Sequence, residues 1–229
     1  MKKDIGIENL RQALSPCCEM SAAPVGSSTP EGRALISQFQ RDARTVLVVA
    51  HHVKTSVEWT WFPLESERRG QTCAADLHAQ AVIENAGRMI ESSGFESVVL
   101  PYPGSCGIAF KKLAALTGMG EIGDNYMFLH PKWGPWVHLR VLLTDAVIVS
   151  PPSPKPKETC THCYKCIEAC PAQALQVGKI DQAACDRFQA AERERLGITV
   201  SFYNKCESCV RSCPIGEEPA ELVPKTLGG

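Results

Sequence analysis

The chain reads CTHCYKCIEACP over residues 160–171 and CESCVRSCP over residues 206–214, and Cys185 lies alone between them. Three thiolates on a tight C-x2-C-x2-C loop can bind three corners of one cubane cluster, so a fourth thiolate must come from elsewhere. In the C-x2-C-x2-C-x3-C-P run of two-cluster proteins, the fourth cysteine ligates the other cluster. Each of the two segments is therefore expected to complete the site of its neighbour.

The second segment lacks the first cysteine of a full run, and Cys185 is the obvious replacement. The spacing predicts two 4Fe-4S clusters, with these two sets of ligands: Cys160, Cys163, Cys166 and Cys213; and Cys170, Cys185, Cys206 and Cys209.

Two other uses of twelve cysteines in 229 residues are zinc binding and a disulfide framework. Neither explains C-x2-C-x2-C-x3-C-P, because a zinc ribbon separates its cysteine pairs by a longer insert and a disulfide framework needs a route out of the cell. The first twenty residues contain no apolar core segment, and no apolar run of membrane length follows. We expect a soluble, cytoplasmic protein with no membrane partner.

The composition is that of a folded globular chain, with 44% hydrophobic and 21% charged residues. The 24 basic residues nearly cancel the 25 acidic ones, which leaves a net charge of -1. Such a charge gives no long-range attraction for a polyanion. We therefore expect no nucleic-acid partner.

The segment SPPSPKPKE at residues 150–158 predicts a stiff, extended linker. It would separate an α/β cofactor-binding domain at residues 1–149 from a ferredoxin-like double 4Fe-4S domain at residues 159–229. Within the first domain, residues 74–92 predict a long amphipathic helix, with helical spacing through Leu77, Ala81, Ile83 and Met89. The expected elements are strands at 45–50, 97–100 and 136–143, and helices at 74–92 and 108–116.

The segment GMGEIGDNYMFLHPKWGPWVHLRVLLTD, residues 118–145, has three glycines in its first six residues, which can admit a flat ligand. This segment resembles that of the epoxyqueuosine reductases, which carry GLGWIGKN-x-LL, then G-x-W, then LLTD. The matching positions are Gly118, Gly120, Ile122, Gly123 and Asn125, then Gly134 and Trp136, then residues 142–145.

The resemblance covers residues 43–214, continues through both cysteine segments, and extends to the corrinoid-dependent reductive dehalogenases. It implies an α/β (α+β) fold, with a nitroreductase-like cobalamin-binding domain before the double 4Fe-4S domain. The contacts with cobalamin that it implies are Gly118, Met119, Gly120, Ile122, Gly123, Asn125 and Trp136.

The chain departs from the family at its proton donor. The family carries an aspartate in a D-S-A-P segment, whereas residues 104–107 read GSCG here. General acid catalysis would then pass to Tyr102, Cys106 or bound water, and Cys106 lies in a glycine-flanked loop before a helix, where a thiolate is favoured. Glu121 and Asp124 also replace a tryptophan and a lysine of the family, which indicates a shift in cofactor preference. The missing aspartate, the net charge and the chain's end at residue 229, which leaves no room for the family's helical repeat domain, lead us to expect a substrate other than tRNA.

Our first hypothesis is a cobalamin-dependent reductase of an unknown small molecule, supplied by a low-potential electron donor. The alternative is an electron-transfer protein that reduces a corrinoid or flavin on a partner redox protein. A third possibility keeps the clusters and places a flavin in the first domain.

Overall fold

The computed structural model describes residues 4–12, 14–63, 71–101, 107–149, 158–197 and 205–216. The protein divides into two compact units, and each unit is assembled from separate parts of the chain. The first unit contains Met1–His52, His78–Glu121 and His138–Lys157, and the second contains Val53–Leu77, Ile122–Val137 and Glu158–Gly229. Because residues 150–157 lie outside the described residues, the linker and its domain boundaries remain a prediction.

A four-stranded sheet in the order β2-β3-β9-β6 forms the centre of the first unit. Its strands are β2 (Cys18–Pro24), β3 (Thr45–His52), β9 (Val137–Thr144) and β6 (Ser97–Val99). β2 is antiparallel to β3, and β6 is antiparallel to β9. β3 is buried along almost its whole length, as expected for an apolar run in the middle of a sheet. Two short strands, β1 (Ile5–Gly6) and β10 (Ile148–Val149), pair in parallel.

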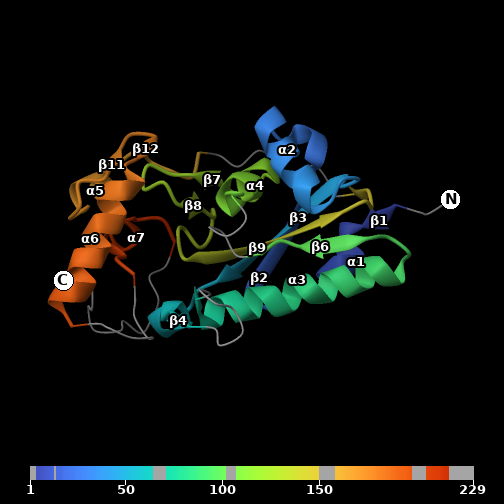
Figure 1. Ribbon diagram of the computed structural model, residues 1–229, viewed down its shortest axis with the longest axis horizontal. Helices are drawn as coiled ribbons and strands as arrows, with labels where there is room; N and C mark the ends of the chain where they lie inside the picture. The colour runs from blue at the N-terminus through green and yellow to red at the C-terminus, as the bar shows by residue number, and fades with distance from the viewer. Residues whose placement is uncertain are drawn as a thin grey trace. The chain divides into compact units, whose positions relative to one another are not determined.

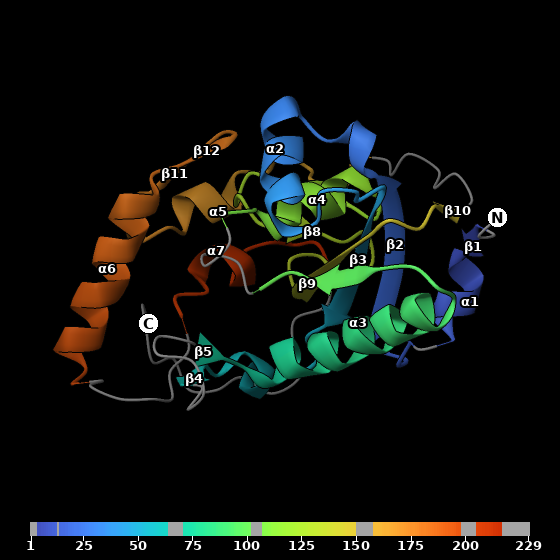
Figure 2. The same cartoon turned by 45° about the vertical axis from the view of Figure 1, so that its right-hand side comes forward.

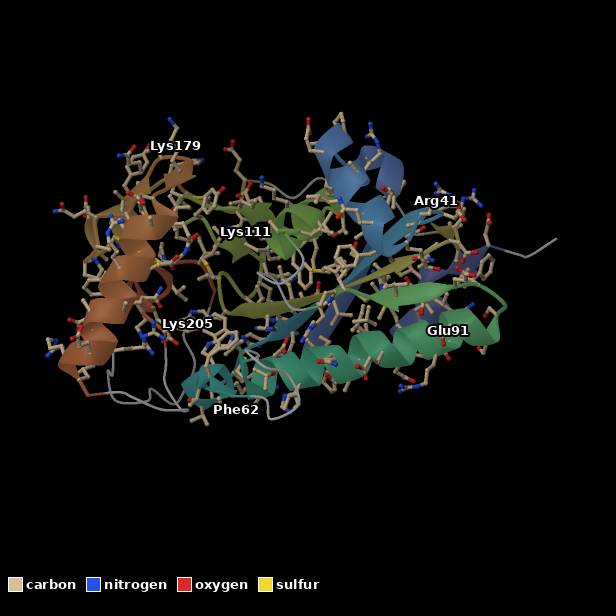
Figure 3. All side chains as sticks on the ribbon, in the orientation of Figure 1. Arg41, Phe62, Glu91, Lys111, Lys179 and Lys205 are labelled. Atoms are coloured by element: carbon tan, nitrogen blue, oxygen red, sulfur yellow. The ribbon has the colours of Figure 1, made fainter. Side chains whose placement is uncertain are left out.

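Helices cover both faces of this sheet (Figures 1 and 2): α3 (Ala74–Ser92) runs along one face, and α2 (Pro30–Phe39) and α4 (Phe110–Leu116) lie over the other. A short helix, α1 (Ile7–Arg11), precedes β2. Two residues define the N-terminus of α2. The Thr29 side chain caps the helix by accepting a hydrogen bond from the Gly32 N–H at 3.1 Å, and Pro30 occupies the first turn. Glu91, labelled in Figure 3, accepts a hydrogen bond from Ser97 Oγ at 2.8 Å and so ties the end of α3 to β6.

The core of the first unit lies between α3 and the sheet. Ile83 and Ile90 of α3 pack with Leu47 of β3 and Leu142 of β9, and all four are fully buried. Burying each such side chain contributes about 1.5–3 kcal/mol. The expected bounds of α3 are confirmed, but part of its expected buried face is wrong, because the Leu77 side chain is 44% exposed.

The second unit consists of short elements. They are the helices η2 (Ser56–Trp59), α5 (Lys165–Glu168), α6 (Gln182–Arg195) and α7 (Ser208–Arg211), and the strand pairs β4 (Phe62–Pro63) with β5 (Gln71–Thr72), β7 (Glu121–Ile122) with β8 (Phe128–Leu129), and β11 (Leu175–Gln176) with β12 (Lys179–Ile180). A single 3-10 turn, η1 (Val25–Ser27), belongs to the first unit. α5 and α7, which lie within the two cysteine segments, pack against each other.

The remaining elements expected from the sequence are present within two residues of their expected ends: β3, β6, β9 and α4. The mixed α/β class is therefore confirmed. Among the described residues, no helix combines the length and the apolar character that crossing a bilayer requires.

Candidate metal centre

The first cysteine loop curls tightly before α5. His162 and Tyr164 both have left-handed backbone conformations, with φ values of 50° and 59°. Such conformations are unfavourable for residues other than glycine, so the surrounding structure must hold them in place. The resulting turn allows Cys160, Cys163 and Cys166 to line one pocket.

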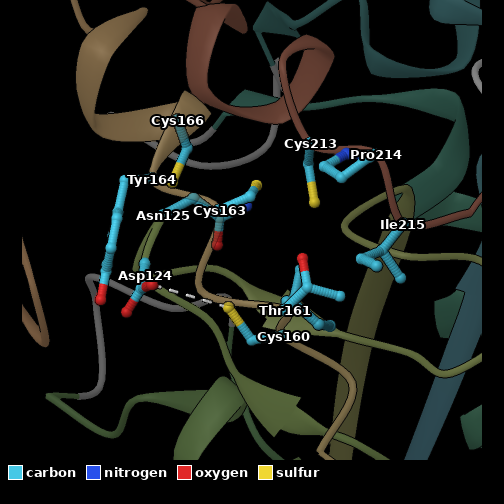
Figure 4. Close-up of a pocket in the computed structure, with 11 residues that line it drawn as sticks. Asp124, Asn125, Cys160, Thr161, Cys163, Tyr164, Cys166, Cys213, Pro214 and Ile215 are labelled. Carbon is cyan, nitrogen blue, oxygen red and sulfur yellow. Dashed lines mark hydrogen bonds between the residues drawn. The ribbon is translucent and has the colours of Figure 1, made fainter.

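That pocket also receives a cysteine from the second segment. Its lining contains Cys160, Cys163, Cys166 and Cys213, together with Asp124, Asn125, Leu129, Thr161, Tyr164, Pro214 and Ile215. Figure 4 shows the four sulfur atoms around a common space, with Asp124 on one side and Ile215 on the other. The structure thus brings together the four thiols that the spacing assigns to one cluster, although Cys213 lies more than forty residues after the other three in sequence.

Burial makes two of these four thiols hard to ionise. It raises the pKa of Cys166 to about 11, and the Asp124 carboxylate and the Cys213 thiol add to the rise. Burial likewise raises the pKa of Cys213, and Cys160 and Cys163 add a smaller repulsion. Four thiolates so close together require a compensating positive charge, and a metal centre supplies one.

The other four cysteines form a second group around α6 and α7. Asp181 caps α6 by accepting a hydrogen bond from the Ala184 N–H at 2.9 Å, and this places Cys185 in the first turn. Burial raises the pKa of Cys209 to about 12, and repulsion from Cys206, Cys170 and Cys185 adds to it. The thiols of Cys206, Cys170 and Cys185 thus lie close enough to Cys209 to oppose its ionisation.

Gln189 joins the second group of cysteines to α6. Its Nε2 donates to Cys185 Sγ at 3.5 Å, and its Oε1 accepts a hydrogen bond from the Cys206 N–H at 3.4 Å. One side chain thus orients the lone cysteine of α6 toward the second motif. No sequence pattern points to this role, since a glutamine on a polar helix is usually a solvated residue.

A buried carboxylate lies beside the first group of cysteines. Asp124 is 6% exposed, and its Oδ2 lies 2.9 Å from His162 Nδ1 and 3.8 Å from Cys160 Sγ. A histidine N–H is the natural donor for this oxygen. Sequence reasoning recognised Asp124 only as a departure from the family and missed His162 altogether, although its place between Cys160 and Cys163 was a usable signal.

Of the residues expected to contact cobalamin, Met119, Gly120 and Gly123 are buried, whereas Gly118 and Ile122 are half-buried. Gly123 serves the packing of its own turn, because a Cβ there would lie 2.4 Å from Leu129 Cδ1. Asn125 lines the pocket of the first cysteine group.

The G-x-W segment also packs within the protein. Trp136 is 2% exposed, with its ring centroid 5.4 Å from that of Trp59 and 5.7 Å from the Arg211 guanidinium. A Cβ on Gly134 would lie 1.8 Å from the Ile215 carbonyl oxygen, so only glycine allows this close approach of two backbones.

The expected roles of all these residues toward cobalamin remain predictions. Tyr102 and Cys106, the expected proton donors, lie outside the described residues.

Comparison with known proteins supports the metal chemistry. The family model described as a 4Fe-4S binding domain matches residues 155–176, which contain the first cysteine loop. The fold therefore includes a 4Fe-4S binding domain, and the four-thiolate donor sets suit such a cluster.

The chain is similar in sequence to the epoxyqueuosine reductase of Bacillus anthracis, with 25% identity over 187 residues that cover 75% of this chain and 48% of the relative. The chain spans about a third to a half of the length of the curated relatives that it matches.

Two solved structures share the fold. One is an epoxyqueuosine reductase with an epoxyqueuosine-modified tRNA stem loop, at a TM-score of 0.64 and 16% identity, covering 91% of this chain and 63% of that one. The other is a reductive dehalogenase described in terms of B12-dependent dehalogenation, at a TM-score of 0.55 and 15% identity, covering 86% of this chain and 29% of that one.

The expectation of no nucleic-acid partner is contradicted by the first of these structures, because a protein of this fold is solved with a tRNA stem loop. A net charge of -1 averages over the whole chain, whereas a stem loop touches only one face of a protein, so net charge was a poor guide. The sequence matches, the shared fold and the matched domain agree: this chain is similar in sequence to epoxyqueuosine reductases, shares their fold and contains a 4Fe-4S binding domain.

Proposed function

We propose that this protein is an oxidoreductase that passes electrons through two 4Fe-4S clusters to cobalamin, which then reduces a substrate. The observation that carries the proposal is the pocket in which Cys213 of the second motif joins the three cysteines of the first. This exchange of ligands between motifs is characteristic of paired clusters and has no counterpart in a zinc ribbon.

In this proposal the two groups of cysteines are the cluster ligands. Within the first group, the fold buries some ligands and exposes others. Cys166 is 8% exposed, whereas Cys163 is exposed. The exposed side of the first cluster is then the natural entry for electrons from a low-potential donor. Because the buried thiols must lose their protons on ligation, cluster assembly releases protons.

The case for cobalamin comes from the shared fold with a B12-dependent dehalogenase and from the glycine-rich segment. Of the expected contacts in this segment, Gly118 and Ile122 are half-buried, while Gly123 is committed to contact with Leu129. Cobalamin, when bound, would supply a cobalt ion that takes electrons from the clusters and delivers them to the substrate. The nitroreductase-like description of the first unit is part of this proposal.

The first substrate to test is an epoxyqueuosine-modified tRNA stem loop, since a protein of this fold is solved with one. The segment in which relatives carry a catalytic aspartate is GSCG here, and residues 104–106 lie outside the described residues. Turnover of the stem loop would show that Tyr102, Cys106 or water can replace that acid.

The experiment that tests the proposal is anaerobic reconstitution, followed by metal analysis and a visible spectrum with and without hydroxocobalamin and gel filtration. About eight irons per chain with cobalamin retained is the expected result, since two cubanes carry about four irons each. The same iron content without cobalamin would refute the corrinoid step and leave an electron-transfer protein. A flavin spectrum would replace cobalamin by flavin, and zinc in place of iron would refute the whole proposal.

A further inference from the structure

A buried amide group lies in the wall of the first cysteine pocket. Asn125 is 3% exposed and lines the pocket together with Cys160, Cys163, Cys166 and Cys213. Its Nδ2 is buried and has no hydrogen-bond partner among the described residues. A buried donor that forms no hydrogen bond costs about 1–3 kcal/mol, so such a group usually has a partner that the protein chain itself does not provide.

The orientation of this amide is fixed by the turn in which it lies. Its Oδ1 accepts a hydrogen bond from the Met127 N–H at 3.0 Å, and only the oxygen end of the side chain can accept. The turn is closed by two further bonds, from the Gly123 N–H to the Met127 carbonyl at 3.0 Å and from the Tyr126 N–H to the Gly123 carbonyl at 2.9 Å. Nδ2 is therefore the free end of a rigidly held side chain.

The other polar group that the same turn brings to the pocket has the opposite character. Asp124 presents a carboxylate near Cys160 and is already engaged by His162. A carboxylate cannot donate a hydrogen bond when ionised, so it offers nothing to a sulfur atom. Of the two side chains that this turn brings to the pocket, the amide is the one that can donate.

We propose that Asn125 donates an N–H···S hydrogen bond to the cluster held by Cys160, Cys163, Cys166 and Cys213, and so raises its reduction potential. This inference rests on the 4Fe-4S part of the proposed function and is independent of cobalamin and substrate. Reduction adds one negative charge to the cluster, and the hydrogen bond becomes stronger as the sulfur atoms gain that charge. Asn125 is thus a positioning and tuning residue that acts through the cluster.

The test compares two variants with a matched control in the reconstituted full chain. Asn125→Asp keeps the acceptor for the Met127 N–H but removes the donor, and Asn125→Leu removes both groups at similar volume. Ile215→Val is the control, because Ile215 lines the same pocket without a polar group. All proteins are first checked for iron content, and the cluster potentials are then measured by redox titration monitored by electron paramagnetic resonance.

We expect the equilibrium constant for reduction of one cluster to fall about tenfold or more in both Asn125 variants, which corresponds to about 59 mV for one electron. The fall should be larger for Asn125→Asp, because that variant also adds negative charge. Ile215→Val should shift both potentials by much less than either Asn125 variant does, because it neither removes a hydrogen-bond donor nor adds a charge. Unchanged potentials in Asn125 variants that retain full iron would overturn the inference.

A second measurement covers the case in which neither variant assembles a cluster. Wild-type protein labelled with 15N in its asparagine side chains should show a 15N coupling to the reduced cluster in pulsed electron paramagnetic resonance. Absence of this coupling would refute the hydrogen bond. Absence of iron from the wild-type protein would instead refute the proposed function, so the two failures are distinguishable.

Discussion

Gly134 offers a sharp test of how the second unit supports its cysteines. Its φ is +57°, and a Cβ there would lie 1.8 Å from the Ile215 carbonyl oxygen and 2.6 Å from the Ile215 carbonyl carbon. Gly216 faces the same contact from the other side, since its Cβ would lie 2.3 Å from the Trp133 carbonyl carbon. Two backbones thus touch directly after Cys213, and neither can move aside as a flexible side chain would.

The change Gly134→Ala should therefore combine two costs. The left-handed conformation costs an alanine about 1–2 kcal/mol. The backbone overlap adds a cost comparable to that of overpacking a core, about 1–3 kcal/mol. The total is about 2–5 kcal/mol, and it is concentrated on the segment that carries Cys213.

Gly178→Ala is the matched control, because Gly178 has a φ of +68° but nothing within 4 Å of its Cβ position. It should show the conformational cost alone. The assay is the urea concentration at which the anaerobic holoprotein loses its visible cluster absorbance, together with iron content. At a slope of about 2 kcal/mol/M, the two midpoints should differ by about 0.5–1.5 M. Equal midpoints and equal iron content in the two variants would refute the argument that the Gly134 contact holds Cys213 in place.

Three further predictions follow from the site and the fold. Cys185→Ser should lower the iron content from about eight toward about four per chain. Cys73→Ser, at a fully buried cysteine outside both groups, should retain the iron. Metal analysis distinguishes the two variants, and full iron in Cys185→Ser would contradict the assignment of Cys185 as a ligand. The apo protein should lose stability as the pH rises above 9, because burial raises the pKa of Cys166 to about 11 and of Cys209 to about 12, while the unfolded chain ionises its thiols near 9. The urea midpoints of the reduced apo protein at pH 8 and 10.5 measure this loss. A midpoint that rises with pH would contradict the prediction. Thr29→Ala should cost about 1 kcal/mol by removing the cap of α2, and thermal unfolding checks this against Thr29→Ser, which should retain most of the stability.

The sequence predicted those elements whose residues carry a strong local pattern. An apolar run specified β3, and apolar residues at helical spacing specified α3. β2 was not predicted, because CEMSAAP is rich in small residues with little preference for strands and is fixed by pairing with β3. Local pattern was also insufficient for the buried face of α3, since Leu77 could belong to either side of the helix until its neighbours were known.

The site shows the same difference between features set by local sequence patterns and features set by long-range contacts. Cysteine spacing suggested two sets of four ligands because short loops limit which thiols can reach one cluster. The structure places the first set around one pocket, and the ligand assignments of both sets stay predictions. The contact of Gly134 with Ile215 could not be foreseen, because it joins backbones about eighty residues apart and depends on the whole unit. For the same reason, the position of Asn125 among the cysteines could not be read from a motif match.

The turn at residues 123–127 gives the proposed electron path its physical basis. Ile122, one of the proposed cobalamin contacts, is half-buried, and Asp124 and Asn125 line the first cysteine pocket. Two residues of chain span at most about 7 Å, so a ligand that contacts Ile122 lies close to a cluster held by the neighbouring pocket. The glycine-rich segment need not enclose a cofactor on its own to serve electron transfer. Its buried residues set the wall of the cluster pocket, and its accessible residues set the distance at which an electron acceptor can approach.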